Sequence, residues 1–424
     1  MNKISKILAR QVFDSRGNPT IEAEVFLQDG TFGSAIVPSG ASTGSYEAFE
    51  LKDKQNKDYL GKSVFKAVNN INDIISKKLK NFDVLDQFNL DKALIDLDGT
   101  KQKNNLGANS ILAVSIASFK ASAKFKKIPI YKNFKEEKDL FMPKPLMNII
   151  NGGAHANNSL KIQEFMIRPE SSKSFNESIR MCFLIIQKLK LILEKKNYTT
   201  TVGDEGGFAP SLSSNEDAIE LIIESIDEAG FKPGFDVSIC LDIAANELYK
   251  DGKYSIRSSN FESSDKTIEY YKNLIKEFPI SSIEDPFFED DWDSFSTFKK
   301  SLRDHNSNIQ IVGDDLFVTN RERLMKGIKQ KAANAILIKP NQIGTVSETI
   351  EVIDHAHLKG FNTIMSHRSG DTEDSFIADF AVGMNCSQIK TGSLSRSERV
   401  SKYNRLIKIE EELGKSTKMA KVIK

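Results

Sequence analysis

The chain has 424 residues, more than one hydrophobic core usually holds, so we expect two domains. Its 59 basic residues nearly balance its 58 acidic residues, which argues against a nucleic-acid or anionic-membrane surface. The three cysteines are few and scattered, and no apolar run approaches the roughly 20 residues of a membrane helix. We therefore expect a soluble, intracellular globular protein without a secretory signal or membrane span.

The first part of the chain combines strand-like segments with helical ones. Three segments carry β-type residues, and they lie at 4–13, 21–27 and 32–37. Asp29-Gly30 is a hairpin signal between the last two. Apolar residues at helical spacing follow, and a helix rich in Ala, Ser and Ile is predicted over 109–126. This order predicts an α+β domain over 1–135, built on an antiparallel three-strand meander.

A Lys- and Glu-rich stretch over 132–139 predicts a linker, and beyond it short apolar runs alternate with amphipathic ones. Eight strands are predicted, at 147–150, 165–168, 237–242, 280–284, 309–314, 335–339, 362–366 and 388–391. Helices are predicted at 175–195, 216–229, 265–278, 321–331, 345–359 and 374–382. Eight such strands favour a closed (β/α)8-type barrel over 140–424, with an irregular start because no helix separates the first two.

Three predicted strands end in a carboxylate, namely Asp242, Glu284 and Asp314. Ligands of α/β barrels lie at the carboxyl ends of the strands, so these side chains are expected on one rim. A single strand-terminal acid more often caps a helix or faces water. Three carboxylates at equivalent strand ends favour a cation that they share. Because these ligands are all oxygen atoms and no Cys or His cluster lies nearby in the sequence, the favoured cation is Mg²⁺.

Lys339 and Lys390 each follow an apolar run, where a lone lysine is usually a solvated strand end. On a rim that also holds a dication, the neighbouring positive charge should lower the pKa of these lysines. A lysine that is neutral near pH 7 can act as a general base.

Two loops offer further candidates. Glu205 lies in a glycine-rich loop, 201–207, which is either an ordinary turn or a loop that aims a general acid into the site. His155 follows the first barrel strand, and Gln163-Glu164 opens the second. An isolated histidine is more often structural than catalytic, but its place in a loop on this rim favours a role at the site.

Arg368 and Ser369 follow a strand and could form a phosphate cradle, which is compatible with the alternative of a helix N-cap region. The glycine–serine loop at 39–44, which contains Ser42, lacks the P-loop pattern. We interpret it as a lid over the rim of the second domain.

Eleven stretches of the chain are long and distinctive, namely DSRGNPT, PSGASTG, IDLDGT, NIINGG, QEFMI, VGDEGG, SIEDP, VGDDLFVTN, IKPNQIG, SHRSGDTED and IKTGSLSRSER. Together they closely resemble the enolase family. The resemblance runs from the first strand to about residue 413. It implies a phosphopyruvate hydratase, a lyase that uses Mg²⁺ to dehydrate 2-phosphoglycerate reversibly to phosphoenolpyruvate in glycolysis and gluconeogenesis.

The resemblance also implies roles for single residues. The implied metal ligands are Asp242, Glu284 and Asp314 for one Mg²⁺, and Ser42 for a second that joins with the substrate. The implied catalytic residues are Glu205, Lys339, Glu164 and His155. The implied substrate contacts are His155, Gln163, Glu164, Lys339, Arg368, Ser369 and Lys390. Lys339 would remove the C2 proton and Glu205 would protonate the departing 3-hydroxyl, with its pKa raised by carboxylates such as Glu164.

Two other hypotheses stay open at this point. The chain could be another superfamily lyase or racemase of carboxylate substrates, although such relatives would lack the GASTG serine and the GDEGG acid. It could also be a binding protein that kept the fold, although every implied catalytic residue is present. The family further implies a cytoplasmic homodimer or higher homo-oligomer. Plasminogen binding through lysines such as Lys424, in a secondary cell-surface or secreted pool, could coexist with catalysis.

Overall fold

The N-terminal strands form the predicted antiparallel meander. The computed structural model describes residues 1–40, 44–134, 139–304, 309–414 and 417–422, and its first sheet has the order β1-β2-β3. These strands are β1 (Ile4–Phe13), β2 (Pro19–Leu27) and β3 (Phe32–Ile36). α4 (Ala108–Phe125) covers the buried face of the sheet, and Gly33 permits this approach because a Cβ there would lie 2.3 Å from the Ala117 carbonyl oxygen.

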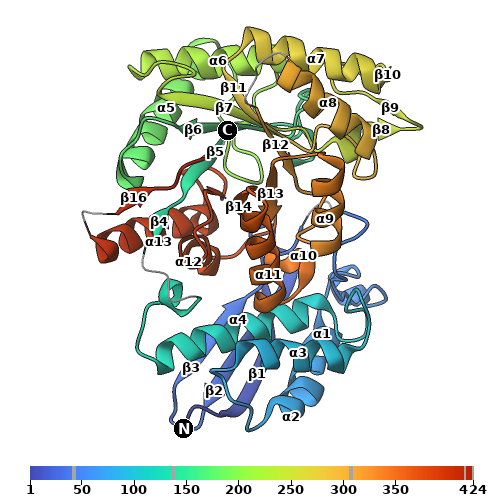
Figure 1. Cartoon of the computed structure of the whole chain (residues 1–424), viewed down its shortest axis with the longest axis vertical. Coiled ribbons are helices and arrows are strands. Elements are labelled where there is room, and N and C mark those ends of the chain that lie inside the picture. Colours follow the sequence, from blue (N-terminus) through green and yellow to red (C-terminus); the bar gives the residue numbers. More distant parts are fainter. Residues whose placement is uncertain (41–43, 135–138, 305–308, 415–416, 423–424) are drawn as a thin grey trace.

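The remaining elements of this region are helices and turns, several of which pack beside α4 (Figure 1). They are η1 (Lys57–Tyr59), α1 (Phe65–Asn69), η2 (Asn70–Ile75), α2 (Ser76–Leu79), α3 (Gln87–Asp98) and η3 (Ile130–Asn133). α3 has clear end signals, because the Asp86 side chain accepts a hydrogen bond from Asn89 N and Gly99 ends the helix at a φ of 71°. The predicted linker at 132–139 lies partly outside the described residues.

Eight strands close into a barrel, which confirms the predicted fold class. They are β5 (Lys144–Asn151), β6 (Glu164–Pro169), β7 (Val237–Asp242), β11 (Ile280–Glu284), β12 (Gln310–Gly313), β13 (Ala335–Ile338), β14 (Asn362–Ser366) and β15 (Gln388–Lys390). Neighbouring strands are parallel except at β6, which runs antiparallel to both β5 and β7. The expected irregular start of the barrel is this reversed strand.

The reversal of β6 decides which of its residues reach the catalytic rim. Glu164, its first residue, pairs with Asp242, the last residue of β7. Arg168, near its other end, pairs with Ser238 near the start of β7. Glu164 therefore lies at the rim where the other strands end, and Arg168 lies at the opposite end of the barrel.

Helices surround the barrel in the upper part of Figure 1. They are α5 (Phe175–Lys195), α6 (Asn215–Glu228), α7 (Ser264–Glu277), α8 (Trp292–Asp304), α9 (Arg321–Gln330), α10 (Pro340–Ile343), α11 (Val346–Leu358), α12 (Phe376–Gly383) and α13 (Ser397–Leu413). Short elements complete the described chain: β4 (Phe141–Met142), η4 (Gly153–His155), η5 (Ala245–Leu248), β8 (Tyr249–Lys250), β9 (Lys253–Tyr254), β10 (Glu262–Ser263) and β16 (Lys418–Met419). The six predicted barrel helices are confirmed within a few residues, whereas α8 and α13 were not predicted.

A layer of apolar side chains fills the middle of the barrel. It consists of Leu146, Met166, Cys240, Val312, Ala335, Leu337 and Ile364, all at most 1% exposed. Side chains alternate along a strand, so the residues two positions before and after a layer residue point the same way. Polar groups thus occupy the barrel on both sides of this layer. No helix in the described ranges is long and apolar enough to cross a membrane.

Candidate active site

The rim at the carboxyl ends of the strands brings acids and lysines together. Asp242, Glu284 and Asp314 are all buried there. The Lys390 ammonium donates hydrogen bonds to Asp242 Oδ2 and Glu284 Oε1, each at 2.8 Å. Lys339 Nζ lies 2.5 Å from Asp314 Oδ2. The structure therefore places the three strand-terminal acids and both lysines at one rim.

The carboxylates at this rim are not all stabilised in their charged form. Burial, and then the charges of Asp242 and Asp314, raise the pKa of Glu284 well above its ordinary value despite the contact with Lys390. Burial and the charge of Asp315 do the same to the pKa of Asp285. Carboxylate oxygens of Asp285, Asp314 and Asp315 lie within 4.8 Å of one another. A surplus of buried negative charge carried by oxygen atoms alone fits a hard dication such as Mg²⁺.

The lysines differ from the expectation that both have lowered pKa values. Burial lowers the pKa of Lys339, but the Asp314 and Glu284 carboxylates together outweigh burial, and the pKa lies above its ordinary value. The pKa of Lys390 is raised well above its ordinary value, because Asp242 and other rim carboxylates outweigh burial. The expectation counted the positive charges on the rim and omitted the carboxylates that each ammonium contacts.

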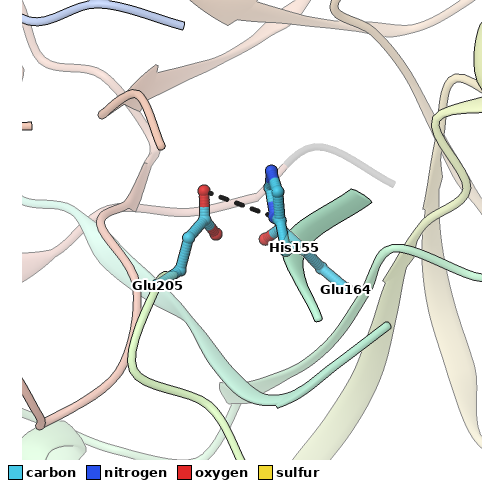
Figure 2. Close-up of side chains that lie close together, drawn as sticks. All are labelled: His155, Glu164 and Glu205. Carbon is cyan, nitrogen blue, oxygen red and sulfur yellow. Dashed lines mark ion pairs between the residues drawn. The ribbon is translucent and has the colours of Figure 1, made fainter. Parts of the chain in front are cut away.

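A second group consists of His155, Glu164 and Glu205 (Figure 2), and it adjoins the first because Glu164 Oε1 lies 3.1 Å from Lys390 Nζ. His155 Nδ1 lies 3.7 Å from Glu164 Oε1 and 3.6 Å from Glu205 Oε1, so the ring lies beside both carboxyl groups. His367 Nε2 approaches Glu205 Oε1 from another side at 3.2 Å. The structure thus brings Glu205 and Glu164 together, as the sequence-based assignment of a proton donor and its helper requires.

The expected pKa shift within this pair is reversed. Burial and the charge of Glu205 raise the pKa of Glu164 well above its ordinary value. Burial also raises the pKa of Glu205, but the His367 and His155 rings and Arg399 outweigh it and leave the pKa well below. A proton shared by the pair is therefore favoured on Glu164.

The guanidinium group of Arg368 meets a carboxylate from the N-terminal region. Its Nη1 and Nη2 lie 2.8 and 3.3 Å from the two oxygens of Glu47. Glu47 also accepts a hydrogen bond from Gly44 N at 3.1 Å, next to the glycine–serine loop. Ser369 is buried beside Arg368. Paired carboxylate oxygens and phosphate oxygens both fit the guanidinium fork, so this contact shows Arg368 able to bind such an anion.

Most sequence-derived site residues line one cavity, namely His155, Gln163, Glu164, Glu205, Asp242, Asp314, Lys339, Arg368, Ser369 and Lys390. Five buried polar atoms at this site have no hydrogen-bond partner in the described part of the chain: Asn148 Oδ1, His155 Nδ1, Gln163 Oε1, Glu164 Oε2 and His367 Nε2. Such atoms are rare in protein interiors because leaving them unpaired costs free energy. Their concentration here indicates a site built for a polar ligand.

Comparison with known proteins agrees with this geometry. The family model "Enolase, C-terminal TIM barrel domain" matches residues 139–422, and "Enolase, N-terminal domain" matches residues 4–134. A curated protein named enolase, from Pelagibacter ubique (strain HTCC1062), is 60% identical over 422 residues, which cover 100% of both chains. The chain belongs to the enolase family.

Enolase is phosphopyruvate hydratase, a lyase that dehydrates 2-phosphoglycerate to phosphoenolpyruvate, and the full-length match assigns this activity to the chain. The alternatives of another superfamily reaction and of a fold kept without catalysis are not favoured. Membership of the enolase family also implies Mg²⁺, which fits the acidic groups at the rim.

One implied metal ligand of this enolase, Ser42, lies outside the described residues. Both described ends of its loop contact the barrel. Ser39 and Gly370 exchange two backbone hydrogen bonds, of 2.8 and 2.9 Å. On the other side of the loop, Ser45 N donates to Glu289 Oε2 at 3.2 Å. These contacts place the described ends of the loop over the rim, and its role as a lid stays a prediction.

Several residues of the enolase site were not identified from the sequence. His367 and Asp315 stand directly beside identified residues, in the SHRSG and GDD stretches, so position along the chain could have indicated them. Gln342 donates to Asp314 Oδ1 at 2.8 Å and lies three positions after Lys339 in the IKPNQIG stretch, so its place after a strand could also have indicated it. Glu47, which contacts Arg368, lies in a segment without a strand-end pattern, and only the three-dimensional structure brings it to the site.

Proposed function

We propose that this enolase carries out the elimination between two opposed groups of residues, with Lys339 on one side and the Glu164–Glu205 pair on the other. The observation that supports this most strongly is that both groups face one cavity whose buried polar atoms lack partners. Asp242, Glu284 and Asp314 would hold one Mg²⁺, and Ser42 would join a second. Bound there, Mg²⁺ would supply positive charge that stabilises the charge developing on the substrate carboxylate.

Lys339 is the proposed general base that takes the proton from C2. A base must be a neutral amine, whereas contact with Asp314 favours the ammonium form of Lys339. The role therefore requires that Asp314 receive positive charge from another partner. Lys390, whose pKa is raised well above its ordinary value, stays charged and is suited to binding the substrate carboxylate.

The Glu164–Glu205 pair is proposed to protonate the departing 3-hydroxyl. Because Glu164 is the favoured carrier of the shared proton, we propose that Glu205 delivers a proton that Glu164 restores. His155 lies beside both carboxyl groups and is proposed to hold their geometry with the substrate in place.

The proposed phosphate site is formed by Arg368 and Ser369. In the structure the Arg368 fork holds the Glu47 carboxylate. Substrate binding would then replace or share this contact. Gln163, whose Nε2 lies 3.4 Å from Asp242 Oδ2 and whose Oε1 has no partner in the described chain, is proposed to contact the substrate near its carboxylate.

The remaining proposals concern the whole protein and rest on the resemblance to the family. We propose domains at 1–135 and 140–424, a cytoplasmic homodimer or higher homo-oligomer, and two Mg²⁺ ions per site. Plasminogen binding at surface lysines, in a secondary cell-surface or secreted pool, is proposed as a role separate from catalysis. Size-exclusion chromatography with light scattering tests the oligomer, and binding of immobilised plasminogen tests the second role.

The direct test of the proposed roles is an assay that follows the ultraviolet absorbance of phosphoenolpyruvate formed from 2-phosphoglycerate. We expect activity with Mg²⁺, none with EDTA, and a loss of about 10²–10⁴-fold in Lys339→Ala, the usual contribution of a general base. Lys331→Ala, which changes an exposed lysine at the end of α9, is the matched control. Activity that survives in Lys339→Ala would keep the lyase function and exclude Lys339 as the base.

A further inference from the structure

Arg399 connects the two loops that carry the proposed acid and phosphate-binding residues. It lies in the first turn of α13 and is 0% exposed. Its Nη2 donates to the carbonyl oxygens of Asp204 at 3.2 Å and Ser369 at 2.5 Å. Its Nη1 donates to the carbonyl oxygen of Arg368 at 2.6 Å. One rigid guanidinium group thus fixes the loop that precedes Glu205 against the loop that carries Arg368 and Ser369.

The chain leaves space for this side chain at a single glycine. Gly392 has a φ of 73°, and a Cβ there would lie 2.9 Å from Arg399 Cδ and 2.6 Å from the Glu205 carbonyl oxygen. The Tyr403 hydroxyl donates to the Gly392 carbonyl oxygen at 2.6 Å and holds this backbone in place. The position of Arg399 is therefore built into the packing between α13 and the Glu205 loop.

The same guanidinium group determines where His367 carries its proton. Arg399 Nη1 lies 2.6 Å from His367 Nδ1. An arginine has N–H donors and no acceptor, so Nδ1 must be the unprotonated, accepting nitrogen. The hydrogen of the neutral ring then lies on Nε2, which is 3.2 Å from Glu205 Oε1. Burial, with Arg399 adding to the effect, lowers the pKa of His367 to about 4, so the ring is neutral near pH 7.

We propose that Arg399 is a positioning residue of this enolase: it holds neutral His367 in the Nε2–H tautomer that faces Glu205 and fixes the Glu205 loop to the phosphate-binding loop. Arg399 does not itself line the cavity and acts through His367 and three backbone carbonyls. The proposal deepens the proposed function and rests on the assignment of Glu205 as the group at the leaving hydroxyl. In the other tautomer, Nε2 would offer a lone pair to a carboxylate and the two groups would repel.

The first test uses the wild-type protein and needs no variant to fold. The enzyme is labelled with ¹⁵N-histidine, and the His367 signals are identified by their loss in His367→Gln. We expect the Nδ1 resonance to be of the unprotonated type and the Nε2 resonance of the protonated type at pH 7. A ring protonated on Nδ1, or on both nitrogens, would overturn the proposal whatever the enzyme's activity.

The second test compares two arginines near the start of α13. Arg399→Met should mix the His367 tautomers and lower kcat by about 10–100-fold, the usual effect of losing a residue that orients a catalytic group. Free guanidinium ion at millimolar concentration should restore part of the loss. Arg396→Met is the matched control, because Arg396 Nε donates to the Gly203 carbonyl oxygen at 3.1 Å and not to His367. An unchanged His367 tautomer in folded Arg399→Met would contradict the proposal.

A double-mutant cycle separates positioning from general destabilisation. In His367→Gln, the side-chain amide always carries N–H donors, whether or not Arg399 is present. In a His367→Gln background, Arg399→Met should therefore cost clearly less in kcat than it does in the wild type. Equal costs in both backgrounds would show that Arg399 does not act through His367. If the wild type forms no phosphoenolpyruvate, the proposed function fails, while the tautomer measurement still decides the role of Arg399.

Discussion

The two ends of the barrel carry buried charges of very different character, although the same strands supply both. At the amino end, Arg168 donates to Glu170 at 2.7 Å, Gln388 at 2.8 Å and Ser281 at 3.0 Å. Lys144 Nζ binds the other Glu170 oxygen at 2.9 Å. Every charge in this group has a partner of opposite sign or a hydrogen bond, so the network is complete without a ligand.

The catalytic rim at the other end is incomplete. Burial raises the pKa values of Glu164, Glu284 and Asp285, and unpaired polar atoms face the cavity. A single strand can carry different charges on the two sides of the apolar layer; β6, for example, carries Glu164 at the rim and Arg168 at the amino end. The comparison shows that a complete polar network serves the fold, whereas an incomplete one of surplus negative charge is what a cation and an anionic substrate need.

The largest effect on stability is expected at the amino end. Arg168→Met would leave the partly buried Glu170 with one positive partner fewer, and would remove a fully buried charge, so the free energy of unfolding should fall by about 3–5 kcal/mol. Turnover per folded molecule should stay within a few-fold of the wild type, because Arg168 lies at the far side of the apolar layer. Urea unfolding and the lyase assay measure the two quantities. Lys188→Met, which removes an exposed pair with Glu228, is the control and should cost less than about 1 kcal/mol.

The free energy of unfolding should also depend on pH because of the amino-end network, and this effect should be somewhat smaller. Burial alone would raise the pKa of Glu170, but Arg168 and Lys144 outweigh it and lower the pKa from 4.5 to about 2. At about 1.4 kcal/mol per pH unit this is worth about 3 kcal/mol. Since the folded pKa is the lower one, this stability is present above pH 4.5 and is lost as pH falls toward 2.

Urea unfolding of the wild type and Glu170→Gln at several pH values checks this expectation. The wild type should be the more stable protein at pH 6, and its advantage should shrink as the pH is lowered from 5 to 3. An advantage that stays constant over this range would show that the Glu170 carboxylate is not specifically stabilised.

At the rim, the free energy of unfolding should depend on pH in the opposite direction, and the expected change is the smallest of the three. The folded-state pKa of Glu164 is raised, so its contribution to stability is full at low pH and is lost as pH rises through that pKa. Glu164→Gln imitates the protonated carboxyl group and should stabilise the protein in EDTA at pH 8 by about 0.5–2 kcal/mol, while turnover falls. Near pH 4 the two proteins should be equally stable. A variant less stable than the wild type at pH 8 would contradict the assignment of the shared proton to Glu164.

Much of the fold was predictable because its signals are local. Short β-branched runs that end in a charge, such as ILIK before Pro340, give both the strand and the rim residue. α13 was missed for a physical reason. Its buried face begins with Arg399 and Lys402 rather than with apolar side chains, so the apolar stripe starts only at Tyr403 and continues to Leu406. α8 carries apolar residues at helical spacing, so the sequence contains the signal for this helix.

The sequence indicates which residues form the site, but it does not indicate the direction of their pKa shifts. Strand ends converge in any barrel, so Asp242 and Lys390 could be assigned to one rim from the sequence. The direction of a pKa shift depends on which charges lie within a few ångströms, and these come from distant segments. Glu205, for example, is controlled by His367 and Arg399, more than 150 positions further along the chain. No local pattern contains that information.

The central claim is that the rim is completed by Mg²⁺ whereas the amino end is complete by itself. The most direct test is urea unfolding at increasing Mg²⁺ concentration for the wild type, Asp242→Asn and Arg168→Met. The account predicts that the wild type gains about 2.7 kcal/mol at 100 times the dissociation constant. Arg168→Met should show the same gain from a lower starting stability, and Asp242→Asn should lose it. A wild type that Mg²⁺ does not stabilise, or a gain that Asp242→Asn keeps and Arg168→Met loses, would contradict the account.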